Sequence, residues 1–435
     1  MTDVQIGFAG IAVLVMLIGL RFPIGVSLIG VSFGGIWLLA GDRAAWGAVG
    51  VIPWGFASTW QLSSIPMFLM MGFLCFHAGL TKGLFEAARV WLARLPGGLA
   101  VASVFGAAGF AAVTGSSIAC AAAMGKIAVP EMMRQRYDAS LATGTVAAAG
   151  TIGALIPPSI LMILYGIIAQ VPVSALFLGG VGAGLLTVTG YVAVIIMRAM
   201  LNPELAPRIE ESTTWMQRLT ALRETWPVLL LMLGVFGGLF TGLFTPTEAG
   251  AVGSALALVI ALVKRSISWA GFRDSLIETL MNSAALFIIA IGASMLTRFL
   301  AYSGAGDTLA DLIGGMDAEP MLLLIGIALV YLFLGMFLEP IGAMLLTLPI
   351  LLPIIDTAGF NLVWFGVLLA KFLEIGMITP PIGLNVFVIK GVVGDLASTS
   401  TIFRGVMWFL VADLFIVVAL VAMPGIILWL PGLFQ

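Results

Sequence analysis

Helix-breaking residues interrupt the apolar sequence at two places where a membrane protein could bind an ion. The two places share a glycine followed by adjacent prolines: Gly153 with Pro157 and Pro158, and Gly376 with Thr379, Pro380 and Pro381. Proline lacks a backbone donor and clashes with the carbonyl one turn back, so two prolines near a glycine should unwind a helix locally. Freed carbonyls are ligands for Na⁺, and the N-termini of half-helices attract anions. The pattern therefore predicts two broken helices that contribute backbone groups to a polar site.

Two long apolar stretches, residues 97–130 and 320–355, are each interrupted halfway by polar or helix-breaking residues. These are Thr114, Gly115, Ser116 and Ser117 in the first stretch, and Glu339 and Pro340 in the second. Lys or Arg residues lie on both sides of the first stretch, and basic loops of membrane proteins lie in the cytoplasm. The charged residues in the loops around the second stretch are all acidic, namely Asp307, Asp311, Asp317, Glu319 and Asp356. We therefore predict two re-entrant hairpins that enter the membrane from opposite faces.

The chain contains an internal repeat at a constant offset of 223 residues. Matching landmarks include Gly19 with Gly242, Pro23 with Pro246, Trp46 with Trp269, Tyr137 with Phe360, and Asp138 with Asn361. The same offset superimposes the two Pro-Pro breaks and places Ser116 and Ser117 on Glu339 and Pro340. Two such halves in a membrane protein are typical of transporters whose site lies at the interface between the repeats. We therefore expect the hairpin tips and broken helices to form one polar centre near the membrane midplane.

The elements that must position this centre are membrane-spanning helices, because 61% of the residues are hydrophobic and only 9% are charged. In soluble domains, charged residues make up about a quarter. We predict an all-α polytopic fold with ten spans, at 4–20, 23–40, 62–80, 139–169, 174–197, 227–243, 246–263, 283–302, 362–391 and 405–430. Five spans per repeat is an odd number, so the second repeat should have an inverted topology relative to the first.

Three domains follow from this assignment. They are a first repeat over 1–197 with its hairpin at about 97–130 and its broken helix at 139–169, a linker over 198–226, and a second repeat over 227–435 with its hairpin at about 320–355 and its broken helix at 362–391. The linker is the most polar segment, and we expect an amphipathic helix on the cytoplasmic surface. Stretches 46–60 and 269–282 each open with Trp, which predicts interfacial helices. The basic residues of the other loops then lie in the cytoplasm except Arg43, and both termini lie in the periplasm.

Several ionisable residues within the apolar segments have more than one interpretation. Glu248 follows Thr245 by three residues, which suits a helix cap or a functional role. Lys371 and Glu374 are three residues apart and could neutralise each other on one helical face, whereas Asp413 stands alone in the last span. His77 is a helix-packing residue or, less favoured, a proton relay.

Composition excludes several classes of function. The net charge is -2 without a basic tail or patch, so we expect no nucleic-acid partner. No phosphate-binding loop for ATP occurs. A hydrolase with Ser116 or Ser117 as nucleophile would need a base at membrane depth, but the single histidine is on another segment. We therefore predict that the chain is not an enzyme, and no cysteine or histidine cluster predicts a bound transition metal.

Four stretches together resemble the DctM-like large membrane subunit of tripartite ATP-independent periplasmic (TRAP) transporters. They are residues 245–250, the tip from Thr114 to Ser117, residues 153–159, and residues 374–383 with Asn385. The resemblance covers essentially the whole chain. It implies an elevator-type secondary transporter in the bacterial inner membrane, driven by Na⁺. It also implies two separate partner chains, a small four-helix membrane subunit and a soluble periplasmic substrate-binding protein, and organic anions such as dicarboxylates, sialic acids or 2-oxo acids as substrates.

The hairpin tips and the broken helices supply the candidate ligands. For Na⁺ these are Gly115, Ser116, Ser117, Thr151, Gly153, Pro157, Glu339, Gly342, Gly376, Thr379 and Pro380. For the organic anion they are Ser116, Ser117, Pro158, Pro340, Pro381 and Asn385. A stand-alone Na⁺/anion symporter with a similar inverted-hairpin fold is the alternative, and membrane lipid is an expected neighbour in either case.

Overall fold

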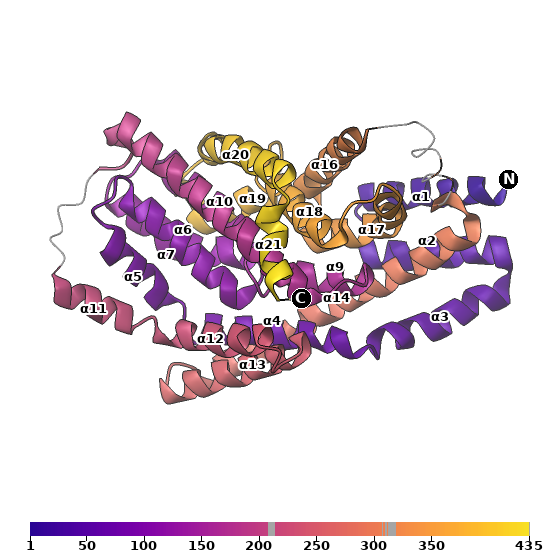
Figure 1. Ribbon diagram of the computed structural model, residues 1–435, viewed down its shortest axis with the longest axis horizontal. Coiled ribbons are helices and arrows are strands. Elements are labelled where there is room, and N and C mark those ends of the chain that lie inside the picture. Colours follow the sequence, from indigo (N-terminus) through magenta and orange to yellow (C-terminus); the bar gives the residue numbers. More distant parts are fainter. Residues whose placement is uncertain (208–213, 307, 309–310, 312–318, 435) are drawn as a thin grey trace.

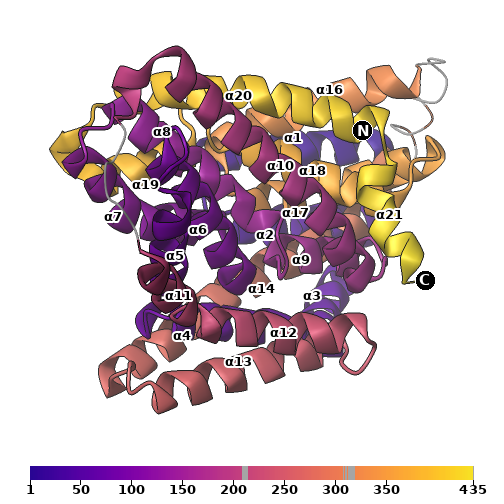
Figure 2. The same cartoon turned by 60° about the vertical axis from the view of Figure 1, so that its left-hand side comes forward.

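The protein is described here by a computed structural model that covers residues 1–207, 214–306, 308, 311 and 319–434. Within these ranges the chain forms helices and no β-strand. Arg208, Glu210 and Glu211 of the linker, and Asp307 and Asp317 before the second hairpin, lie outside the described residues. The helices run in several directions and pack into one body, with α12 and α13 along its lower edge and α16 and α20 along its upper edge (Figures 1 and 2).

The helices of the first half follow the apolar segments of the sequence. They are α1 (Asp3–Gly19), α2 (Ile24–Ala40), α3 (Asp42–Ala57), α4 (Ser64–His77), α5 (Lys82–Leu92), α6 (Gly98–Thr114), α7 (Ser117–Arg134), α8 (Ala139–Gly150), α9 (Ile160–Ile168) and α10 (Val173–Leu201). A short 3₁₀ turn, η2 (Thr151–Ala154), follows α8. The chain therefore leaves helical geometry at the first hairpin tip and at the first Pro-Pro break.

The second half has corresponding interruptions. Its helices are α11 (Trp215–Arg223), α12 (Trp226–Phe240), α13 (Pro246–Val263), α14 (Trp269–Ser303), α16 (Pro320–Phe337), α17 (Pro340–Thr357), α18 (Leu362–Gly376), α19 (Leu384–Val393), α20 (Thr399–Ala422) and α21 (Gly425–Leu433). Only Leu338 and Glu339 separate α16 from α17, and residues 377–383 separate α18 from α19. Both Pro-Pro peptide bonds are cis.

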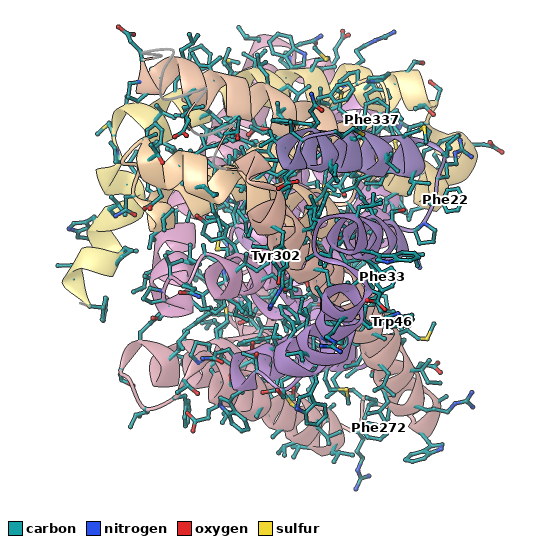
Figure 3. The ribbon with its side chains drawn as sticks, turned by 90° about the vertical axis from the view of Figure 1, so that its right-hand side faces the viewer. Phe22, Phe33, Trp46, Phe272, Tyr302 and Phe337 are labelled. Carbon is teal, nitrogen blue, oxygen red and sulfur yellow. The ribbon has the colours of Figure 1, made fainter. Side chains whose placement is uncertain are left out.

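One group of helices forms a frame beside the hairpins. Helix α14 packs against α2 and α4, and α4 packs against α13. On the outer side of the frame, the rings of Phe33 in α2 and Trp46 in α3 meet edge to face with centroids 5.0 Å apart (Figure 3). Leu14, Leu28 and Phe299 belong to a small core of this frame, separate from the large core around the hairpins and broken helices. The small core draws on α1, α2, α3, the end of α14 and Leu346 of α17, whereas α4, α13 and the middle of α14 belong to the large core.

The two separate helices expected over residues 269–302 are a single helix, while the interfacial position of 269–282 stays a prediction. Helix α14 is continuous over 35 residues, about 52 Å at 1.5 Å per residue. Its polar residues do not break it, because the Asn282 side chain donates to the Glu278 carbonyl at 2.8 Å and Glu278 reaches His77 at 3.3 Å. In the first half, by contrast, α3 and the segment Trp60–His77 meet at 59°.

The last predicted span, 405–430, is also incorrect in its extent. Helix α20 ends at Ala422, and α21 begins at Gly425. Pro424 explains the interruption, because the residue before a proline is pushed out of the helical region, and Met423 has ψ 72°.

Six helices in the described residues are long and apolar enough to cross a membrane, or up to eight if each of two bent pairs counts once. This is fewer than the ten spans predicted. Two of the six, α16 and α17, are the arms of the predicted second hairpin, so four of the ten predicted spans pass on their own. Of the others, both broken helices consist of pieces shorter than a span, α1 and α2 have 17 residues each, and two belong to the bent pairs. The count nevertheless describes a multi-pass membrane protein.

The linker between the halves is only partly a separate segment. Helix α10 continues through Arg198 to Leu201, a short turn follows at Pro203–Leu205, and α11 begins at Trp215. Helices α11 and α12 are bent by 47° relative to each other. Arg218 of α11 lies over the rings of Trp91 and Trp215, so this helix packs against α5 through aromatic contacts.

Candidate functional site

A cavity of about 430 Å³ lies where the two hairpin tips meet the frame. The first tip contributes residues 114–119, the second contributes Glu339, Pro340 and Ile341, and α4 and α14 complete the wall. Ala154 and Ile160 line it on either side of the first break, and Glu374 and Met377 line it just before the second. The elements that the internal repeat singles out therefore converge on one cavity.

The first hairpin tip is in close contact with the first helix break. Gly115 has a φ of +61°, and a β-carbon at this position would lie 2.2 Å from the Pro158 carbonyl oxygen. A β-carbon on Gly153 would lie 2.9 Å from the backbone of Ser116 and Ser117. Both positions therefore require glycine. The Ser116 hydroxyl caps α7 by accepting from the Ala119 N–H at 3.4 Å.

The second tip does not touch the second break in the way that the first tip touches the first. Glu339 occupies the N-cap position of α17 and lines the cavity. The contact with the second broken helix lies one turn before the tip, where a β-carbon on Gly376 would be 2.7 Å from the Gly335 Cα. Gly342 lies next to the tip. A β-carbon on Gly342 would lie 2.9 Å from the side chain of Ile24.

Asn385 joins the two broken helices to each other. It is fully buried, its side-chain amide donates to the Ala147 carbonyl of α8 at 3.4 Å, and its backbone N–H donates to the Met377 carbonyl at 3.0 Å. Its side-chain oxygen has no hydrogen-bond partner among the described residues. Asn385 therefore holds the start of α19 against α8 and retains one unused acceptor.

A buried polar network connects the same two helices through α10 and α20. The Lys371 Nζ donates to Asp413 Oδ1 at 2.6 Å, and both side chains are at most 1% exposed. The Tyr191 hydroxyl lies 3.0 Å from both Asp413 oxygens and 3.1 Å from the Thr151 hydroxyl at the first break. Lys371 therefore forms its direct ion pair with Asp413 and interacts with Glu374 only through its electric field, and Asp413 is not isolated.

The sequence analysis did not include Glu374 among the candidate ligands, nor Glu278 and Asn282, which also line the cavity. The Glu374 side chain is 0% exposed, lines the cavity, and has both carboxylate oxygens unpartnered among the described residues. The internal repeat contained the signal, because the 223-residue offset places Glu374 on Thr151, which was among the candidate ligands. The sequence analysis instead interpreted Glu374 as a partner of Lys371, which lies one helical turn before it.

The cavity brings together only some of the predicted ligands. Gly115, Ser116, Ser117, Glu339 and Pro340 line it, while the other predicted ligands do not: Thr151, Gly153, Pro157, Pro158, Gly342, Gly376, Thr379, Pro380, Pro381 and Asn385. The remaining residues lie in the breaks, in the contacts between a hairpin and a break, or next to the second tip. The Thr379 hydroxyl donates to the Ile375 carbonyl at 2.7 Å.

Two residues with open interpretations have local structural roles. Glu248 forms a capping box with Thr245, accepting from its backbone N–H at 2.8 Å while the Thr245 hydroxyl accepts from the Glu248 N–H at 3.3 Å. His77 lies 3.3 Å from Glu278 and joins α4 to α14.

Known proteins with similar sequences are membrane permeases. The family model described as "Tripartite ATP-independent periplasmic transporter, DctM component" matches residues 11–426. The sialic acid TRAP transporter large permease protein SiaM of Vibrio cholerae is 32% identical over 422 residues, covering 96% of this chain and 97% of the relative. The C4-dicarboxylate TRAP transporter large permease protein DctM of Pseudomonas aeruginosa is 31% identical over 374 residues, covering 86% of each chain.

A similar protein with a longer chain and a similar solved structure extend this comparison. The isethionate TRAP transporter permease protein DctMQ of Oleidesulfovibrio alaskensis is 32% identical over 336 residues, which cover 77% of this chain and 52% of that protein. The crystal structure of the YdaH transporter of Alcanivorax borkumensis matches with a TM-score of 0.59 at 15% identity, covering 88% of this chain and 89% of that one. At this identity the structural likeness concerns the fold alone.

Proposed function

Because the chain belongs to the DctM family of TRAP transporter large permeases, we propose that it imports an organic acid anion by Na⁺-coupled secondary transport. Family membership makes it a transport protein of the membrane. The coupling ion, the substrate class and the transport mechanism are the parts that we propose. The observation that carries the proposal is the single cavity lined by both hairpin tips and by residues next to both helix breaks.

Na⁺ coupling is supported by the chemistry of the groups at this cavity. Hydroxyl, carboxylate and unwound backbone oxygens are suitable ligands for a hard cation. Ser117 and Glu339 supply the first two, and the backbone around Gly153 and Gly376 supplies the third. Each Na⁺ that enters through a membrane potential of ~100 mV contributes roughly 2.3 kcal/mol to uptake. We propose one Na⁺ at each tip-and-break pair.

The substrate proposal rests on the relatives and on the ends of the half-helices. The relatives are named for sialic acid, C4-dicarboxylate and isethionate, all of which are organic anions. In this chain α7 and α17 begin at the two tips, and the positive ends of helix dipoles favour anions. We therefore propose an organic anion that binds near Ser116 and Pro340 once cations occupy the site.

The transport proposal divides the molecule into a moving part and a scaffold. The hairpins and broken helices share one apolar core, whereas part of the frame has its own core. We propose an elevator mechanism in which the hairpin region moves against a scaffold that includes α1, α2, α3 and the end of α14, whose side chains make up most of the small core. We further propose that the chain works in the bacterial inner membrane with both termini in the periplasm, together with a small four-helix subunit and a periplasmic substrate-binding protein.

Component omission tests this proposal. Proteoliposomes would contain the chain, the small subunit and the binding protein of the same transporter, and uptake of labelled sialic acid, succinate and isethionate would be measured with and without an inward Na⁺ gradient. We expect uptake of one class that requires both the gradient and the binding protein. Uptake by this chain alone would instead favour the stand-alone symporter, and Na⁺-independent uptake would refute the coupling.

A further inference from the structure

A buried hydrogen-bonded network joins the first helix break to an ion pair of the second half. The Tyr191 hydroxyl of α10 lies 3.1 Å from the Thr151 hydroxyl at the first break and 3.0 Å from both carboxylate oxygens of Asp413 in α20. Lys371 of α18 donates to Asp413 at 2.6 Å. All four side chains are at most 1% exposed. Tyr191 is therefore the link between the ion pair and the break.

The acceptors around the two hydroxyl groups determine where their hydrogens go, because each hydroxyl carries only one. An ionised carboxylate that pairs with a lysine only accepts hydrogen bonds, so Tyr191 donates its hydrogen to Asp413. The Thr151 hydrogen remains for the Tyr191 oxygen at 3.1 Å and for the Ala148 carbonyl at 2.6 Å. The charge of Asp413 therefore orients a chain of hydrogen bonds that ends at the first break.

The residue at the end of this chain begins the turn that meets the first hairpin tip. Thr151 is the first residue of η2, and Gly153 in the same turn packs so closely that a β-carbon there would lie 2.9 Å from the backbone of the tip. Just after the turn, the Leu155 carbonyl oxygen would lie 2.5 Å from a β-carbon on Gly180 of α10. Helix α10 thus holds η2 at both ends, through the Tyr191 hydroxyl at its start and through Gly180 after its end.

We propose that Tyr191 is a positioning residue for cation binding at the first break, and that the Lys371–Asp413 pair holds it in that role. Tyr191 acts through Thr151, whose fixed hydroxyl sets the start of η2 and with it the backbone oxygens of the break. A turn that is already ordered binds a cation more tightly, because less conformational entropy is lost on binding. The inference rests on the proposed Na⁺ coupling and adds no further ion to it.

This role makes the two breaks unequal in how they bind a cation. At the 223-residue offset, Leu414 corresponds to Tyr191, so the second half has an apolar side chain where the first has a hydroxyl. The first break therefore depends on charges that the second half supplies, whereas the second break does not depend on Tyr191. Loss of the Tyr191 hydroxyl should weaken cation binding at the first break and leave the Na⁺-to-anion stoichiometry unchanged.

Tyr191→Phe tests this role because it removes only the hydroxyl. The ring keeps its edge-to-face contact with Phe409 at 5.2 Å and its position 5.4 Å from the Lys371 Nζ, and Asp413 keeps its ion pair. Proteoliposomes with the complete transporter would be given whichever of labelled sialic acid, succinate and isethionate the wild type transports, and Na⁺ would be titrated against choline. The half-saturating Na⁺ concentration should rise about fivefold, while uptake at saturating Na⁺ should stay near the wild-type rate.

Tyr331→Phe is the matched control for a purely structural effect. The Tyr331 hydroxyl is equally buried and bonds to the Thr347 hydroxyl at 2.7 Å, but this pair joins the two arms of the second hairpin. Both variants should melt at a lower temperature, and only Tyr191→Phe should change the half-saturating Na⁺ concentration. An unchanged value in Tyr191→Phe, or an equal rise in Tyr331→Phe, would overturn this inference alone. Na⁺-independent uptake by the wild type would refute the proposed function itself.

A double-mutant cycle tests whether Tyr191 acts through Thr151. Thr151→Val removes the hydroxyl and should raise the half-saturating Na⁺ concentration, and adding Tyr191→Phe should then raise it no further. Thr151→Ser retains the hydroxyl and should keep the wild-type value. Additive effects of the two substitutions, or a wild-type value in Thr151→Val, would overturn the inference. If Tyr191→Phe does not fold, the comparison of Thr151→Val with Thr151→Ser decides: equal Na⁺ dependence in these two variants would overturn it.

Discussion

The two broken helices share their motif but differ in their surroundings. Pro157 and Pro158 of the first break are buried, while Pro380 and Pro381 of the second are exposed. The first break is covered by α10, where a β-carbon on Gly180 would lie 2.5 Å from the Leu155 carbonyl oxygen. The second packs against Gly335 of α16 and, through Asn385, against α8, while its two prolines remain exposed. The motif thus determines that a helix breaks, and the neighbouring helices determine whether the break is enclosed.

The two halves also differ in the charged residues near their helix breaks. At the 223-residue offset, Lys371 and Asp413 correspond to Ala148 and Gly190, so the first half has no counterpart of the buried ion pair. Glu374 corresponds to Thr151, whose hydroxyl hydrogen-bonds to Tyr191. The charged residues near the breaks therefore all come from the second half, and the first break meets the ion pair only through Tyr191.

The largest expected effect comes from breaking the ion pair of the second half. Lys371→Met leaves Asp413 buried without its cation, which should lower the free energy of unfolding by about 3–5 kcal/mol. Denaturant unfolding of the purified protein measures this. The double variant Lys371→Met with Asp413→Leu should recover most of the loss. If Lys371→Met is as stable as the wild type, the pair does not hold α18 against α20.

A smaller effect is expected at the tip that packs against the enclosed break. Gly115→Ala places a β-carbon 2.2 Å from the Pro158 carbonyl oxygen at a φ of +61°. The backbone conformation alone should cost about 1–3 kcal/mol, and uptake should fall with it. The matched control is Gly109→Ala in α6, the helix that ends just before Gly115, where a β-carbon meets only the flexible end of Leu84. Similar melting temperatures for both variants would contradict the close contact between tip and break.

The smallest effect is expected at the N-caps of the two broken helices, where the contribution to stability should depend on pH in one helix and not in the other. Asp138 caps α8 and Asn361 caps α18, each accepting two backbone hydrogen bonds, so replacing either by Ala should cost about 1 kcal/mol. Partial burial alone would raise the pKa of Asp138, but hydrogen bonds from Ser140 and from the Leu141 N–H lower it below its usual value.

The sign of this pH dependence follows from the lowered pKa. The stabilisation by ionised Asp138 is present above the unfolded-state pKa of about 3.9 and is lost as pH falls through the folded-state pKa. The loss on Asp138→Ala should therefore shrink in acid, while the loss on Asn361→Ala should not change. Chemical denaturation at pH 7 and pH 3 measures both, and an acid-independent loss at Asp138 would contradict the assigned hydrogen bonds.

The positions of the helix breaks were predictable because local chemistry produces them. Adjacent prolines interrupt a helix wherever they occur, and α8 and α18 end before them as expected. The continuity of α14 was not predictable from its polar residues, since Asp274, Glu278 and Asn282 interrupt the hydropathy pattern without changing the backbone. Polarity indicates exposure or pairing, whereas adjacent prolines indicate a break; single prolines such as Pro130 in α7 and Pro353 in α17 lie inside continuous helices.

The pairing of the buried charges could not be predicted from sequence spacing. Lys371 has an acidic residue one turn away, but its partner Asp413 lies 42 residues along the chain on α20. Only the packing of α18 against α20 determines this choice. For the same reason, the position of Glu374 beside Ser117 in the wall of the cavity could not be predicted from sequence spacing.

The measurement that tests the central claim most directly is the response of transport to the direction of the Na⁺ gradient. The complete transporter would be reconstituted with the membrane potential clamped at zero, and flux of the transported anion would be followed with Na⁺ high outside, equal on both sides, or replaced by choline. The account predicts accumulation of the anion only with the inward gradient. Accumulation in choline, or accumulation independent of the Na⁺ gradient, would contradict it.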